Sequence, residues 1–126
     1  MLQRSLLWDY RIFYLRLSLS GVDTMTVQLN NPPDLNEAYT AQTSTYGIQT
    51  TDSFVACQGN FTTTLPTAVG VTGKNYTIKN TGTGVVTIAT TSSQTIDGVT
   101  TYVIRTTNSG VTLISNGANW LIKAVF

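Results

Sequence analysis

The sequence predicts an all-β protein: a small antiparallel β-sandwich, or a flattened barrel, with an extended N-terminal arm. Threonine is heavily over-represented, and its β-branched side chain favours strands. From Asp52 onward, short apolar alternations recur between turn signals, with the spacing typical of sandwiches and barrels. Charged residues make up only 10% of the chain, which favours a protein that presents surfaces over one that moves protons. A chain of 126 residues can form one domain with a real core.

The main domain is expected to span residues 52–126. Its Asp97-Gly98 pair is a two-residue hairpin signal. A Thr–apolar pair also recurs, but its spacing is too irregular to predict a solenoid repeat. The alternating segments that we expect to form strands are 54–58, 61–65, 75–79, 85–89, 102–105 and 111–114.

The clearest local prediction is a hairpin at the C-terminus. Asn116-Gly117 is the preferred central pair of a type I′ turn, because both positions need a positive φ. A two-residue turn there places Leu113 opposite Trp120. Since side chains alternate with period two, we expect Leu113, Trp120 and Ile122 in the core. Phe126 continues the Trp120 face, so the C-terminus should be tied down.

Residues 25–51 are expected to form the extended arm. The breaker at 31–33 (Asn-Pro-Pro) excludes regular structure there. Asp34 followed by Glu37 has the form of a helix N-cap with its capping partner, so at most one helical turn follows, over 35–39. The rest of the arm, to residue 51, is polar.

Residues 1–24 do not match the rest of the chain. They hold three of the four arginines in a dense apolar and aromatic mix. Asp9, Arg11 and Arg16 interrupt the apolar run, so neither a signal peptide nor a membrane span is expected. Two interpretations remain: upstream translation from a mis-assigned start, or a short helix.

The reactive residue types exclude several kinds of chemistry. The chain has no histidine, so Ser-His and Cys-His nucleophiles and His-containing zinc sites are excluded. The single Cys57 cannot form an intramolecular disulfide, and its apolar run without a basic neighbour indicates a buried, inert thiol. The few basic residues of the main domain are scattered, so nucleic-acid binding through phosphates is not expected.

The carboxylates offer no clear catalytic pair. A glycosidase needs two of them roughly 5–9.5 Å apart, whereas most of those present have local explanations: a cap, its partner, a strand start and the Asp97 turn. One carboxylate beside a glycine is also a weak signal for calcium. We therefore assign no catalytic, cofactor-binding or metal-binding residue and expect no enzyme. The carboxylates are Asp9, Asp23, Asp34, Glu37, Asp52 and Asp97.

Aromatic side chains are the remaining candidates for ligand binding. Trp120 could stack on a sugar, but the hairpin register favours the core for it. Tyr39 and Tyr46, in the polar arm, are freer to contact a partner. No ligand-binding residue is assigned from the sequence. Two glycosylation sequons, at Asn60 and Asn75, would matter only in a secreted eukaryotic protein.

An ordered set of short motifs extends through residues 52–126. It comprises FVAC (54–57), FTTTLP (61–66), GKNYTIKN (73–80), GVVTI (84–88), QTIDG (94–98) and SNGANW (115–120). The set resembles a small β-domain common near the C-termini of bacteriophage tail fibres and other virion appendage proteins. Many relatives have Asp where this chain has Asn116, and Asn serves the same turn. Residues 1–24 have no counterpart in the family.

The resemblance implies a structural protein of the virion, in a tail fibre, an appendage or capsid decoration. It implies a homotrimer that contacts other virion proteins and attaches to a host surface, including its glycans, by multivalent contact. The family supplies no agreed catalytic or sugar-binding residues. Because the polar arm is long for a loop inside a compact domain, we expect it to reach a neighbouring subunit or dock on the particle. The alternative is a non-catalytic carbohydrate-binding module.

Overall fold

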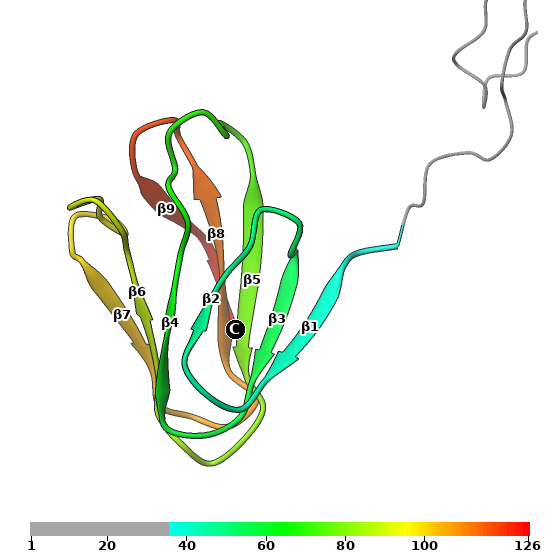
Figure 1. Cartoon of the computed structure of the whole chain (residues 1–126). Helices are drawn as coiled ribbons and strands as arrows, with labels where there is room; N and C mark the ends of the chain where they lie inside the picture. The colour runs from blue at the N-terminus through cyan, green and yellow to red at the C-terminus, as the bar shows by residue number, and fades with distance from the viewer. Residues whose placement is uncertain (1–35) are drawn as a thin grey trace, which may run out of the picture. The chain divides into compact units, whose positions relative to one another are not determined.

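The computed structural model describes residues 36–126 (Figure 1). The predictions for segment 1–24, for Asp34 and for the first part of the arm lie outside the described residues. The described strands are β1 (Tyr39–Gln42), β2 (Tyr46–Gly47), β3 (Phe54–Cys57), β4 (Phe61–Thr64), β5 (Asn75–Asn80), β6 (Val86–Ala89), β7 (Thr101–Ile104), β8 (Gly110–Ser115) and β9 (Trp120–Val125).

The strands form two sheets that face each other (Figure 1). One has five strands in the order β1-β3-β5-β8-β9, and the other has four in the order β2-β4-β6-β7. The sheets are separate, so the all-β sandwich is confirmed and the barrel is not formed. No helix long and apolar enough to span a membrane occurs in residues 36–126.

The strand directions differ from the prediction. We expected antiparallel sheets, but β1, β3 and β5 are parallel to one another, as are β2, β4 and β6. The first six strands alternate between the two sheets, so each successive strand pair adds one coil on top of the last. The antiparallel strand pairs of the described residues are β5 with β8, β6 with β7 and β8 with β9. The prediction was wrong because alternation reports which face a residue occupies and carries no information on strand direction.

The coils explain why no repeat was visible in the sequence. Tyr39 aligns with Phe54 and Phe54 aligns with Thr77, so the first coil is much shorter than the second. The parallel stacking of a solenoid is therefore present over three coils, although the sequence has no constant period.

The core lies between the two sheets. Leu113 and Trp120 are both fully buried, as predicted, whereas Ile122 is half-buried at the margin of the core. The Trp120 and Tyr76 rings pack 5.4 Å apart, and the Trp120 indole N–H donates to the Pro66 carbonyl at 3.2 Å. The N–H group of the largest fully buried side chain thus has a hydrogen-bond acceptor, so burying the indole leaves no polar atom of Trp120 unpaired.

The C-terminal hairpin has a longer turn than predicted. Ser115 pairs with Trp120, so the loop has four residues, and only Gly117 has a positive φ, of 94°. The Asn116 side-chain oxygen accepts the backbone N–H groups of the two residues before β9, at 2.9 and 2.8 Å. This side-chain turn replaces the type I′ turn. The register moves by two residues, so the predicted core face is retained.

Two other predictions, one on a turn and one on the end of the chain, are confirmed. Asp97 and Gly98 have φ of 48° and 92°, and the flanking Ile96 and Val99 exchange two backbone hydrogen bonds, as in a type I′ turn. At the C-terminus, the Phe126 N–H and C=O both bond to Gly110, so the end of the chain is tied down although the Phe126 side chain is 50% exposed.

The boundary between arm and domain was predicted too late in the chain. Residues 37–126 form one compact unit, with β1 and β2 inside it and Ile48 buried in the core. The helical turn expected over 35–39 is not seen in the part of it that the structure describes, because Tyr39 begins β1 and the exposed Glu37 lies in no helix. β1 and β2 join the sheets through backbone pairing with β3 and β4, so neither strand needs an alternation of apolar residues.

Candidate functional site

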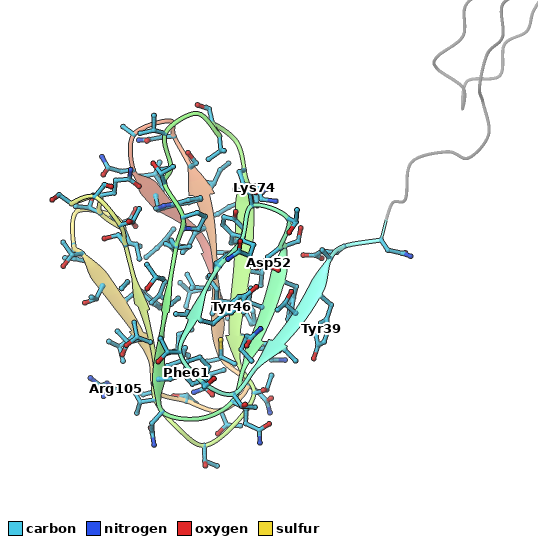
Figure 2. All side chains as sticks on the ribbon, viewed as in Figure 1. Tyr39, Tyr46, Asp52, Phe61, Lys74 and Arg105 are labelled. Atoms are coloured by element: carbon cyan, nitrogen blue, oxygen red, sulfur yellow. The ribbon has the colours of Figure 1, made fainter. Side chains whose placement is uncertain are left out.

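A buried carboxylate lies at the junction of the first coil with the second. Asp52 is in the turn between β2 and β3 and is 6% exposed. One of its oxygens accepts the Thr40 hydroxyl at 2.6 Å. The other accepts the Tyr46 hydroxyl and the Gln49 backbone N–H, each at 2.8 Å (Figure 2). One side chain therefore ties β1, β2 and the turn to the start of β3.

The electrostatics keep this carboxylate charged. Burial alone would raise the pKa of Asp52, but hydrogen bonds from Thr40, Gln49 and Tyr46, with the positive charge of Lys74, outweigh it and lower the pKa. Burial and the adjacent carboxylate raise the pKa of Tyr46 to about 12. An ionised Asp52 and a neutral Tyr46 therefore coexist across the physiological pH range.

The network continues onto β5 and its preceding loop. The Tyr76 hydroxyl donates to the Gln49 carbonyl at 3.1 Å, and the Lys74 ammonium lies 4.9 Å from the centre of the Tyr76 ring. Burial and the Asp52 charge raise the pKa of Tyr76. We call this set the Asp52 network. Its members are Thr40, Tyr46, Gln49, Asp52, Lys74 and Tyr76.

The Asp52 network is built as a structural clamp. Both carboxylate oxygens accept hydrogen bonds from groups that the fold has positioned. In residues 36–126, no three His, Cys, Asp or Glu side chains lie close enough together to hold a metal ion. We therefore interpret the role of the network as structural: it holds the first coil against the rest of the domain.

An exposed aromatic pair lies on the strand that this clamp anchors. Tyr39 is 67% exposed and stacks on Phe54 of the adjacent strand, with ring centres 5.9 Å apart and an interplanar angle of 18°. The Asp52–Thr40 bond holds the residue next to Tyr39. Tyr39 is thus a solvent-exposed ring on a rigid edge strand (Figure 2), and this Tyr39–Phe54 surface is the candidate contact site.

The outer face of the four-stranded sheet is neutral. Register places its outward side chains in two cross-strand rows of small, uncharged residues. On the five-stranded sheet, the Thr77 and Thr112 hydroxyls bond each other at 2.9 Å. The outer face of the four-stranded sheet therefore suits contact with a neutral surface, whereas the outer side of β5 in the other sheet also carries Lys79. The rows of the four-stranded sheet are Thr62, Thr87 and Val103, and Thr64, Ala89 and Thr101.

The other predicted residues have structural roles. Cys57 is fully buried, and burial raises its pKa to about 11, as expected for an inert thiol. Asp97 is a turn residue whose side chain accepts the Ile122 backbone N–H at 3.1 Å. The Asn60 side chain accepts the Val85 N–H at 2.7 Å. Asp9 and Asp23 lie outside the described residues.

Two residues of this region have roles that the sequence did not predict. Tyr46 was expected to be free for a partner, but its hydroxyl bonds to Asp52. Asp52 was interpreted only as a strand-start residue. Its hydroxyl partners Thr40 and Tyr46 precede it by 12 and 6 residues, and no short motif links such positions. Tyr39, by contrast, is exposed, so its ring is accessible to a partner.

Comparison with known proteins adds no identity: no protein family matches the chain, and no curated protein is similar to it.

Proposed function

We propose that the protein is a non-enzymatic structural protein of a bacteriophage virion, in a tail fibre, an appendage or capsid decoration. It acts by multivalent surface contact, including attachment to a host. The observation that carries the proposal is a sandwich with a neutral, Thr-rich outer face on its four-stranded sheet and an exposed aromatic pair at the clamped edge of the other sheet. The ordered motifs of residues 52–126, which resemble a virion appendage domain, point the same way.

The scarcity of titrating groups supports this role. Residues 36–126 contain seven charged side chains, and one of these, Asp52, is buried with its charge satisfied. A surface that hardly changes its charge with pH keeps the same contacts as a particle moves between environments. Weak contacts of this kind become effective when several copies bind together. The proposal therefore includes a homo-oligomer, with three copies as the number that the resemblance implies.

Particle composition tests the proposal. Purified particles of the phage whose genome encodes the chain should contain it in several copies each, measured by quantitative mass spectrometry. Particles that lack the chain while infected cells contain it would contradict a virion role.

The second candidate is a carbohydrate-binding module, and the exposed Tyr39 ring favours it specifically. Aromatic rings with an accessible face are suited to stacking on sugar rings. A glycan array probed with the full chain at concentrations where it is monomeric separates the two functions. Binding by the monomer that is lost in Tyr39→Ala, and retained in a Val103→Ala control on the opposite sheet, would favour the module.

A further inference from the structure

The first strand presents unpaired backbone groups at a sheet edge. Among the described residues, β1 pairs on one side only, with β3. The carbonyls of Ala38 and Gln42 accept N–H groups of Phe54 and Gln58 at 2.8 and 2.9 Å. Since alternate residues of a strand direct their backbone groups to opposite sides, the N–H and C=O groups of Tyr39 and Ala41 point to the open edge.

This edge lacks the protection that the other edge of the same sheet carries. On β9, a register irregularity opposite Thr112 and Leu113 and the charged Lys123 interrupt the ladder. Asp97 covers part of it, since its backbone N–H bonds to Trp120 and its side chain accepts the Ile122 N–H. β1, with the sequence YTAQ, has no charge, no proline and no bulge. Natural proteins usually block such an edge unless it is used.

We propose that β1 is an interface between two copies of this chain, in which the β1 strands pair antiparallel about a two-fold axis at Thr40. An antiparallel edge is self-complementary, so the same groups on both copies satisfy each other. In this register Tyr39 lies opposite Ala41 of the second copy, and their outward backbone groups exchange hydrogen bonds. The two five-stranded sheets then become one continuous sheet.

The side chains at this edge favour a second copy as the occupant. Tyr39 and Ala41 lie on the same outer face, and both are exposed. Each tyrosine ring can therefore cover the small alanine opposite it. The nearest charge, Glu37, lies opposite Thr43 of the other copy and not opposite another carboxylate, so no like charges meet. The partner strand is as neutral as the edge that it meets.

The strand is also fixed before association. Phe54 stacks under the Tyr39 ring, and Asp52 holds the Thr40 side chain. Pairing therefore orders little that is not already ordered, which lowers the entropic cost of association.

The inference stands apart from the proposed function. A two-fold contact joins copies in pairs, whereas the resemblance implies three copies, so the two ideas predict different masses. Either can fail without the other.

Sedimentation equilibrium of the full chain tests the contact. We expect twice the 13.6 kDa chain mass at high protein concentration. Ala41→Lys should weaken the dimer by about tenfold or more, since it places a long charged side chain against Tyr39 of the other copy and brings two like charges diagonally across the contact. Thr101→Lys, at an exposed position on the edge strand β7, is the matched control and should change nothing. Each variant's thermal unfolding shows whether it is folded. If Ala41→Lys does not fold, Tyr39→Ser removes only the exposed ring and should also weaken the dimer.

Amide hydrogen exchange locates the contact independently. The Tyr39 and Ala41 amides should be protected at high concentration and exchange quickly on dilution, whereas the Thr40 and Gln42 amides should be protected at both. An oligomer of any size that Ala41→Lys leaves intact would overturn the inference, and a trimer of that kind would leave the proposed function standing. If the Tyr39 and Ala41 amides stay protected in the diluted monomer, the inference is also overturned, because a segment of the same chain then covers the β1 edge.

Discussion

The Asp52 carboxylate accepts the Tyr46 hydroxyl at 2.8 Å, and this bond joins the second strand of the first coil to the beginning of the second coil. The same carboxylate holds Thr40 of β1. The short strands β1 and β2, which have little apolar surface of their own, are thus both held by one charged residue. The stability of the edge that carries Tyr39 depends on that charge.

Removing the carboxylate should destabilise the domain clearly. Asp52→Ala leaves two hydroxyl groups and a backbone N–H without their acceptor, and we expect a loss of about 2–4 kcal/mol in the free energy of unfolding. Glu37→Gln, at an exposed carboxylate, is the matched control and should change it by less than about 0.5 kcal/mol. Urea unfolding followed by circular dichroism measures both. Equal stabilities for the two variants would show that the network contributes nothing.

Acid should reproduce part of this loss in the unmodified chain. The folded state lowers the pKa of Asp52 below its ordinary 3.8. The resulting stabilisation is complete above that value and is lost as the pH falls through the lower, folded-state pKa. Stability should therefore decline below about pH 4, and Asp52→Asn should decline less steeply over that range. The slope of unfolding free energy against pH, measured for both proteins, tests this. Identical slopes would count against a lowered pKa.

Alkali should destabilise the domain through Tyr46, the hydrogen-bond partner of Asp52. The pKa of Tyr46 is raised from 10.0 to about 12. A raised pKa gives stabilisation that is complete below the unfolded-state value and is lost as the pH rises through the folded-state value, so stability should fall between about pH 10 and 12. Absorbance titration of the phenolates should show a late-ionising group that disappears in Tyr46→Phe. If Tyr46→Phe removes an early-ionising group instead, the bond to Asp52 is not formed in solution.

Gly84 and Gly47 differ in how much space is available for an added side chain. A methyl group on Gly84 would lie 2.4 Å from the backbone C and O of Gly59, whereas one on Gly47 meets nothing within 4 Å. Gly84→Ala should cost about 1–3 kcal/mol by overpacking. Gly47→Ala should be neutral or stabilise by up to about 1 kcal/mol. Thermal unfolding of the pair measures the difference, and equal unfolding temperatures would show that the loops do not approach so closely.

The buried face of the sandwich was predictable from the sequence, and the reason is periodicity. Side chains alternate along each strand of the C-terminal hairpin, so a register shift by an even number of residues leaves Leu113 and Trp120 on the same face. The observed shift is two residues, and the predicted core face is therefore correct although the turn is longer. The Asp97-Gly98 turn was predictable because both central positions of a type I′ turn need a positive φ, and Asp-Gly is one of the few residue pairs that adopt it readily.

The first coil and the Asp52 network were not predictable on the same grounds. Tyr39–Gln42 alternates weakly, and its pairing depends on a parallel neighbour that is formed by residues beyond Asp52. The value of Asp52 as a clamp depends on residues brought to it by folding. A two-residue strand such as β2 has no sequence pattern of its own.

The central claim is that this neutral sandwich works as an assembly of copies. Sedimentation equilibrium of the full chain over a wide concentration range tests it most directly. The account predicts a mass that approaches a whole multiple of 13.6 kDa, greater than one, as concentration rises. A single-chain mass at every concentration would contradict both the multivalent role and the pairing through β1.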